Sequence, residues 1–274
     1  MKKFQFILFV LLFLSGCSNL NPVPSSTTYE PQQKDVINNH GGIENIEQID
    51  QFVNNINNGE NDEVRIIHYT IEGDPIIWDL TYDGTSIQSR YDTTYDKFGS
   101  GKVEKHSCER ITKSEMDTEI AYKLECNGQQ EDVLTVQYDT EKQDKFEFHF
   151  KYGVDKKNEV DTANQRLVKD LQNGEVSTVS DFQFNRKELN QIYKAMVLTN
   201  YLDQKDLSNS CNKKPYESYE LTIWINGGER HFEWTECDIS KHGLQMNKMK
   251  NNILHVIRDN ETYKSLPPTK GVYQ

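Results

Sequence analysis

The chain has 274 residues, and its 43 acidic side chains outnumber its 31 basic ones, giving a formal net charge of -12 at pH 7. Its lysines and arginines never run longer than a pair, so we expect no basic patch for nucleic acid or for anionic lipid headgroups. Phe, Tyr and Trp make up 11% of the chain. This supplies enough large apolar area for one large or two small domains.

Residues 1–16 have the order of a secretory signal peptide. Lys2 and Lys3 precede the apolar run 4–14, and Ser15 and Gly16 separate it from Cys17. The run is too short to cross a membrane, which takes about 20 apolar residues. Residues 14–17 resemble the lipobox of bacterial lipoproteins, which implies that Cys17 receives a diacylglyceryl group and begins the mature chain. Two acyl chains give stable attachment. We therefore expect a lipid-anchored protein on the extracytoplasmic face of the cell membrane.

The next segment, residues 17–34, is rich in Asn, Pro, Ser, Thr and Gln, and we interpret it as a lipidated, flexible, disordered tether. Four cysteines remain after Cys17, an even number that in an exported protein favours disulfides over a metal site. Their spacing along predicted hairpins pairs Cys108 with Cys126 and Cys211 with Cys237, each bridge inside its own domain.

Residues 35–152 are predicted to form an N-terminal α+β domain. Apolar residues at helical spacing between Ile43 and Ile56 predict an amphipathic helix. Strand-like segments at 64–71, 76–82 and 86–91 predict an antiparallel meander that the helix covers. A two-residue turn at 83–84 would pair Leu80 with Ile87, and a four-residue loop at 72–75 would pair Tyr69 with Trp78. Later segments at 103–111, 119–126, 133–138 and 145–152 are expected to extend this sheet.

Residues 153–174 are predicted to be a linker with a short helix on Ala163, Leu167 and Leu171. Residues 175–274 are predicted to form a C-terminal α+β domain. It would contain a helix opened by a capping box at residues 185–188, a hairpin around the turn 226–228, and a final helix at about 241–258. The predicted fold class is thus α+β, with two small domains that each pack helices on an antiparallel sheet.

The sequence contains no catalytic or metal-binding motif, so we predict no catalytic residue, no metal ligand and no cofactor. Asp92 and Asp96 lie four apart in a loop and could approach a hard cation, but a solvated turn is the favoured interpretation. Trp224 falls opposite the core face of its strand, where it would contact a ligand if exposed, but the favoured interpretation is that one of the two flanking helices covers that side. The seven histidines do not cluster in the sequence.

The segments 35–43, 65–76 and 82–84, with the core Tyr-Thr-Ile-Glu-Gly-Asp-Pro at 69–75, resemble the uncharacterised lipoproteins of bacillus-type Gram-positive bacteria that carry a domain of unknown function. The resemblance covers about residues 35–126 and implies no activity. We expect a surface protein that binds a protein or a small molecule and is not an enzyme. The alternatives are a hydrolase acting on cell wall or peptides, with carboxylates assembled in space, and a cystatin-like protease inhibitor, suggested by fold analogy alone.

Overall fold

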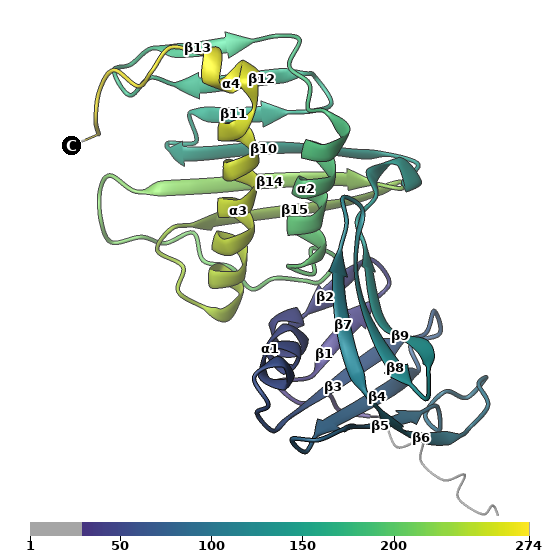
Figure 1. Ribbon diagram of the computed structural model, residues 1–274. Coiled ribbons are helices and arrows are strands. Elements are labelled where there is room, and N and C mark those ends of the chain that lie inside the picture. The colour runs from purple at the N-terminus through teal and green to yellow at the C-terminus, as the bar shows by residue number, and fades with distance from the viewer. Residues whose placement is uncertain (1–28, 274) are drawn as a thin grey trace, which may run out of the picture. The chain divides into compact units, whose positions relative to one another are not determined.

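The computed structural model describes residues 29–273 (Figure 1). The predicted signal peptide, Cys17 and most of the predicted tether lie outside the described residues. Residues 31–274 form one compact unit. Its described part is a mixed α/β structure with three sheets and four α-helices. None of the described helices is both long and apolar enough to cross a bilayer.

The first sheet has six strands in the order β2-β1-β3-β4-β5-β6. Their bounds are β1 Val36–Asn39, β2 Gly42–Glu44, β3 Asp62–Tyr69, β4 Pro75–Tyr82, β5 Ile87–Asp92 and β6 Val103–Cys108. Helix α1, Ile46–Asn57, packs against β3 and β1, and its buried face carries Ile46, Ile49, Phe52 and Val53. The predicted helix on an antiparallel meander is confirmed. The short hairpin β1–β2, which joins the sheet by parallel pairing of β1 with β3, was not predicted.

The predicted register of the β4–β5 hairpin is wrong by two residues. Tyr82, rather than Leu80, lies opposite Ile87. The connection has four residues because the Asp83 side chain accepts hydrogen bonds from the backbone N–H groups of Thr85 and Ser86, at 2.9 and 3.0 Å. These side-chain hydrogen bonds stabilise a four-residue connection, which competes with the two-residue turn that an Asp-Gly pair can also form.

The predicted register of β3 against β4 is wrong by three residues. Trp78 lies opposite Ile66 instead of Tyr69. The loop runs over residues 70–74 and is closed by a 2.9 Å hydrogen bond from the Thr70 N–H to the Asp74 carbonyl. Because side chains alternate along a strand, an odd shift exchanges the two faces. The core face of β3 therefore carries Val64 and Ile66, and Ile71 is 87% exposed in the loop.

The segments directly after β6 were predicted to extend the first sheet, and this prediction is wrong. They form a second, three-stranded sheet. Its strands are β7 Arg110–Glu115, β8 Glu119–Cys126 and β9 Gln129–Gln137, in that order. The predicted disulfide between Cys108 and Cys126 joins the ends of β6 and β8. This bridge links the two sheets at the point where the chain passes from one to the other.

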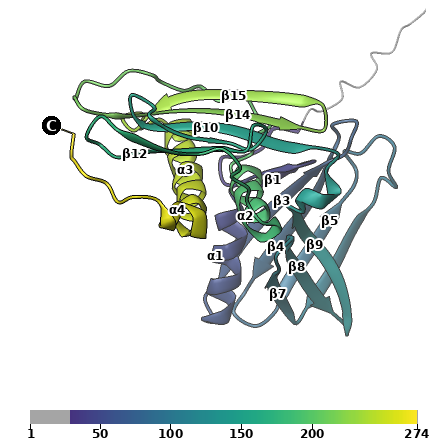
Figure 2. The ribbon, with the colours of Figure 1, turned by 90° about the horizontal axis from the view of Figure 1, so that it is seen from above.

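The third sheet has six strands in the order β13-β12-β11-β10-β14-β15. Their bounds are β10 Phe146–Val154, β11 Asn158–Asp161, β12 Arg166–Asp170, β13 Val176–Val179, β14 Glu217–Ile225 and β15 Gly228–Thr235, preceded by the 3-10 turn η1, Thr140–Lys142. Helices α2, Arg186–Val197, and α3, Lys241–Asp259, cover one face of this sheet (Figure 2), and α4, Glu261–Ser265, follows α3. The second predicted disulfide, Cys211 to Cys237, is also present.

The predicted linker with a short helix at residues 153–174 is wrong. This stretch holds the end of β10 and all of β11 and β12, and Ala163 lies in the turn between the last two. Val160 and Leu167 pair with each other and are fully buried on the core face of the sheet. Packing of paired side chains across the two strands therefore determines the structure here, although the spacing of the apolar residues also fits a helix. The predicted boundary at residue 153 cuts through β10, which belongs to the C-terminal sheet.

The capping box of α2 provides a test of the local structure. The Glu188 N–H donates to the Asn185 side chain at 3.0 Å, and the Asn185 N–H donates back to the Glu188 carboxylate at 2.8 Å. We expect Asn185→Ala to lower the free energy of unfolding by about 1 kcal/mol in urea denaturation. Asn251→Ala, at an exposed position inside α3, should leave it unchanged or slightly raised, because alanine favours a helix interior. Equal losses in both variants would contradict a capping role.

Candidate functional site

A cleft of about 600 Å³ lies where β1, β3 and β9 face α2 and the β14–β15 turn. Its lining includes four amide side chains, Asn38, Gln137, Gln143 and Asn226. None of the lining residues that the structure describes is Asp, Glu, Lys or Arg. A second hollow of about 490 Å³ adjoins it and shares His40, Tyr69 and Leu202 with it. The cleft is thus polar without formal charge.

One wall of the cleft is fixed by the imidazole of His68. Its Nε2 lies 2.8 Å from the Val133 carbonyl oxygen, so this nitrogen carries the proton and donates. Its Nδ1 then accepts from the Asn38 side-chain amide at 3.0 Å. Burial lowers the pKa of His68 below 6.5, and the hydrogen bond to Val133 offsets part of that effect. His68 is therefore a neutral group that joins β1 and β3 to β9.

The opposite end of the cleft is closed by the two-residue turn between β14 and β15. Asn226 adopts a positive φ of 48° there, as such a turn requires. Its side-chain amide donates to the Gln143 side chain at 2.8 Å, and its side-chain oxygen accepts from the Asp144 N–H at 2.9 Å. These bonds hold the hairpin tip against the segment that leads into β10.

Helices α2 and α3 leave the other face of the third sheet uncovered, and we call it the open face (Figure 2). The strand register places polar side chains such as His149, Thr222 and His231 on it. The predicted ligand contact Trp224 lies on it, half-buried, and its indole N–H donates to Glu229 on β15 at 2.9 Å. The favoured interpretation that a helix covers this tryptophan is wrong, since α2 and α3 both pack on the other face of the sheet (Figure 2). Its role as a ligand contact stays a prediction.

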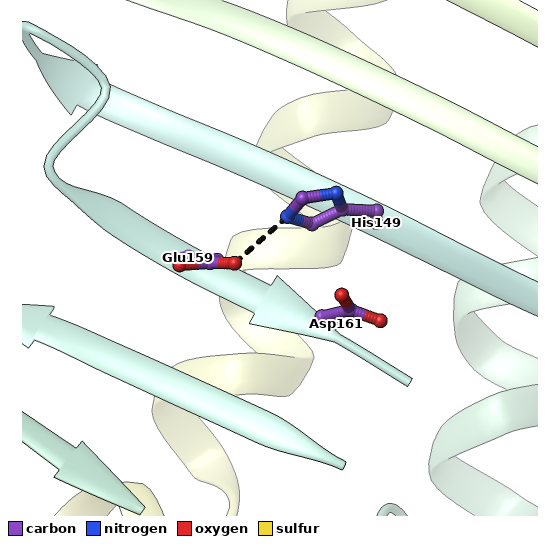
Figure 3. Close-up of side chains that lie close together, drawn as sticks. All are labelled: His149, Glu159 and Asp161. Atoms are coloured by element: carbon purple, nitrogen blue, oxygen red, sulfur yellow. Dashed lines mark hydrogen bonds and ion pairs between the residues drawn. The ribbon is translucent and has the colours of Figure 1, made fainter. Parts of the chain in front are cut away.

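Two clusters of histidine and carboxylate lie on the open face. His149 of β10 lies beside Glu159 and Asp161 of β11, with its Nε2 2.9 Å from a Glu159 oxygen (Figure 3). The other cluster consists of Glu220, His231 and Glu233. The first cluster was not predicted from the sequence, because residues 158–161 were assigned to a linker instead of a strand. Alternating polar residues along 147–151 and 159–161 were the available signal.

Asp92 and Asp96, the other predicted contacts, stabilise their own turn. One Asp92 oxygen accepts from the N–H and the hydroxyl of Thr94 at 2.9 and 2.6 Å, and the other accepts from Arg90 at 2.5 Å. Burial raises the pKa of Asp92, but these hydrogen bonds lower it by more than burial raises it. The net shift of the pKa is therefore downward. Asp96 accepts from the Phe98 N–H at 2.9 Å. The carboxylates hold their own turn, but Asp92 is only 3% exposed, so the favoured interpretation of a solvated turn is wrong for this residue.

Comparison with known proteins identifies one domain. Residues 33–123 match a domain of unknown function, DUF4362. This agrees with the predicted domain of unknown function over residues 35–126, and it covers the first sheet, α1, β7 and most of β8. No curated protein and no solved structure matches the chain. The matched domain contributes one wall of the cleft, through Asn38 and His68.

The partly buried imidazole of His68 predicts a loss of stability in acid. Because the pKa of His68 is lowered in the folded protein, the unfolded chain binds more protons as the pH falls below 6.5, and the free energy of unfolding decreases. His68→Gln keeps an amide that can donate to Val133 and accept from Asn38. We expect the wild type to lose more stability than this variant between about pH 7.5 and about pH 5, measured by urea unfolding. Parallel pH profiles would contradict the assignment of a partly buried, neutral imidazole.

Proposed function

We propose that this protein is an exported, lipid-anchored binding protein whose cleft takes an uncharged, hydroxyl-rich ligand such as a small saccharide. The observation that carries the proposal is the cleft itself, which lacks formal charge in its described lining although the chain has a net charge of -12. Its volume of about 600 Å³ is typical of small-molecule sites.

The chemistry of the lining supports an uncharged polar ligand. Amide side chains such as Gln137 and Asn38 each combine donor and acceptor groups, which suits hydroxyl groups that do both. Val136 and Ile225 also line the cleft and add apolar contact area to it. A charged ligand would lose its hydration in this cleft without gaining an ionic partner, which is unfavourable. The lining therefore favours neutral ligands over anions and cations.

Binding is better supported than hydrolysis. Hydrolysis by assembled carboxylates needs two acids, or an acid and a histidine, facing one substrate. Of the described cleft residues, His40 and His68 are the only histidines, and both ring nitrogens of His68 already have partners within the chain. The histidine and carboxylate clusters lie on the open face of the third sheet, and their residues do not line this cleft.

The location outside the cytoplasm is supported by the two disulfides, because such bridges persist in oxidising compartments. The order of charged, apolar and small residues before Cys17 supports export and lipidation at that cysteine. A protein with this topology would present its cleft on the outer side of the membrane, where extracytoplasmic saccharides can reach it.

Lipid anchoring predicts that membrane attachment depends on the sulfur of Cys17. Cys17→Ser should leave an uncleaved or released precursor, because two acyl chains are lost with the thioether, and membrane fractionation and gel mobility measure the change. The disulfides between the other four cysteines should be unaffected, as non-reducing peptide mapping can check. Equal membrane retention of both proteins, with no difference in their mobility, would refute the anchor.

The cleft proposal predicts binding of a neutral sugar that depends little on salt. We expect chitobiose, the neutral N-acetylglucosamine disaccharide, to bind better by calorimetry than the disaccharide in which N-acetylmuramic acid adds one carboxylate. Its affinity should change little between low and high ionic strength, because no ionic contact is screened. Failure of chitobiose to bind, or tighter binding of the anionic disaccharide, would overturn the assignment of an uncharged ligand.

A matched pair of variants on β9 locates the binding site. Gln137 is exposed at the cleft, so Gln137→Trp should fill the cleft and weaken chitobiose binding about tenfold or more, which is about 1.4 kcal/mol. Gln130→Trp places the same ring at an exposed position of the same strand outside the cleft and should leave the affinity unchanged. Equal affinities for both variants and the wild type would place the ligand elsewhere.

A further inference from the structure

We propose that His149, Glu159 and Asp161 form a binding site for one divalent transition-metal ion, with Zn²⁺ as the ion to test. Each residue offers one ligand atom, and the three atoms lie within 4.8 Å of one another. Imidazole nitrogen with two carboxylate oxygens is a ligand set that such ions accept, and water can complete the coordination. This site is separate from the cleft and does not depend on the proposed function.

The strand pairing explains why the three ligands converge. His149 on β10 lies directly opposite Asp161 on β11, and Glu159 precedes Asp161 by two residues and so shares its face (Figure 3). Neighbouring side chains on one face of an antiparallel pair are about 5 Å apart. The imidazole and the Glu159 carboxylate are already in contact at 2.9 Å. A small contraction around one ion would therefore bring all three donors to bonding distance.

The two carboxylates of this cluster have hydrogen-bond partners but, in the part of the chain that the structure describes, no close lysine or arginine. Asp161 is only 6% exposed, and the His149 and Glu159 side chains are 22% and 20% exposed. The Arg166 guanidinium approaches Glu159 only to 3.7 Å and is itself half exposed. Hydrogen bonds alone leave the negative charge of two carboxylates that are partly removed from water. A divalent ion would neutralise both of them.

The second cluster on the same face shows what the first one lacks. The Lys156 ammonium lies 2.9 Å from a Glu220 oxygen and 3.0 Å from a Glu233 oxygen, so it bridges the two carboxylates. These hydrogen bonds raise the pKa of Lys156 although its burial acts in the opposite direction. In the second cluster the Lys156 ammonium therefore already provides the positive charge between the two carboxylates. For this reason we assign the metal to the first cluster alone.

Partners outside the ligand set orient Asp161. The N–H of Asn164 donates to one carboxylate oxygen at 3.0 Å, and its side-chain amide donates to the other at 2.8 Å. Each carboxylate oxygen has two lone pairs, so both keep the capacity to bind a metal. Hydrogen bonds of this kind commonly hold metal-ligating carboxylates in position. The Asp161 side chain is thus fixed before any ion arrives.

The test is calorimetric titration of the disulfide-intact protein with Zn²⁺. We expect one Zn²⁺ per chain in the wild type. His149→Gln keeps a donor for Glu159 but removes the imidazole ligand, and should weaken binding about tenfold or more. His231→Gln removes the histidine of the second cluster on the same face and should leave affinity and stoichiometry unchanged. Circular dichroism verifies that both variants are folded.

A second measurement needs no variant. Adding Zn²⁺ to the wild type should shift the imidazole nitrogen resonances of His149, assigned by ¹⁵N NMR, and leave those of His231 in place. The proposal is overturned if the wild type takes up no Zn²⁺ stoichiometrically, if His149→Gln binds as the wild type does, or if His231→Gln is the weaker binder. Chitobiose binding to the cleft tests the other proposal and is unaffected by any of these outcomes.

Discussion

The pairing of β10 with β14 is the constraint on which the C-terminal part of the structure depends. It joins residues 146–154 to residues 217–225 through nine paired positions. On one face it places Phe148 and Phe150 beside Ile223 and Leu221, all fully buried beneath the helices. Each such side chain contributes about 1.5–3 kcal/mol when buried. Because strand side chains alternate, the same register places His149 on the open face, where β11 supplies its carboxylate partners.

Local sequence signals were sufficient for α1, α2 and α3 and for one hairpin, and insufficient for long-range pairing. The capping box at Asn185 and the turn at Asn226 act within a few residues, and both have the predicted geometry. The parallel contact of β1 with β3 and the assignment of β10 to the C-terminal sheet depend on partners far along the chain. Apolar residues at 163, 167 and 171 also fit helical spacing, so only the burial of Leu167 against Val160 identifies strands there.

The candidate sites were less predictable than the fold for the same reason. The cleft draws its lining from segments around residues 38–42, 68–69, 135–143, 193–202 and 225–226, and no motif connects them. The position of Trp224 opposite the core face followed correctly from strand alternation, whereas the expected cover by a helix was wrong because both helices pack on the other face. The cluster around His149 did not, because it requires both the strand assignment of residues 158–161 and their pairing register with β10. A histidine and two carboxylates at this spacing carry no recognisable sequence pattern.

The hairpin β14–β15 lies between the two proposed sites. Ile225 and Asn226 at its tip line the cleft, whereas Thr222 of β14 lies between His149 of β10 and His231 of β15 on the open face. Alternation directs Thr222 and Ile225 to opposite faces of the same strand. A substitution on the open face therefore removes no atom from the cleft lining. Ligand binding in the cleft and metal binding on the sheet can accordingly be changed one at a time, even though one pair of strands supports both.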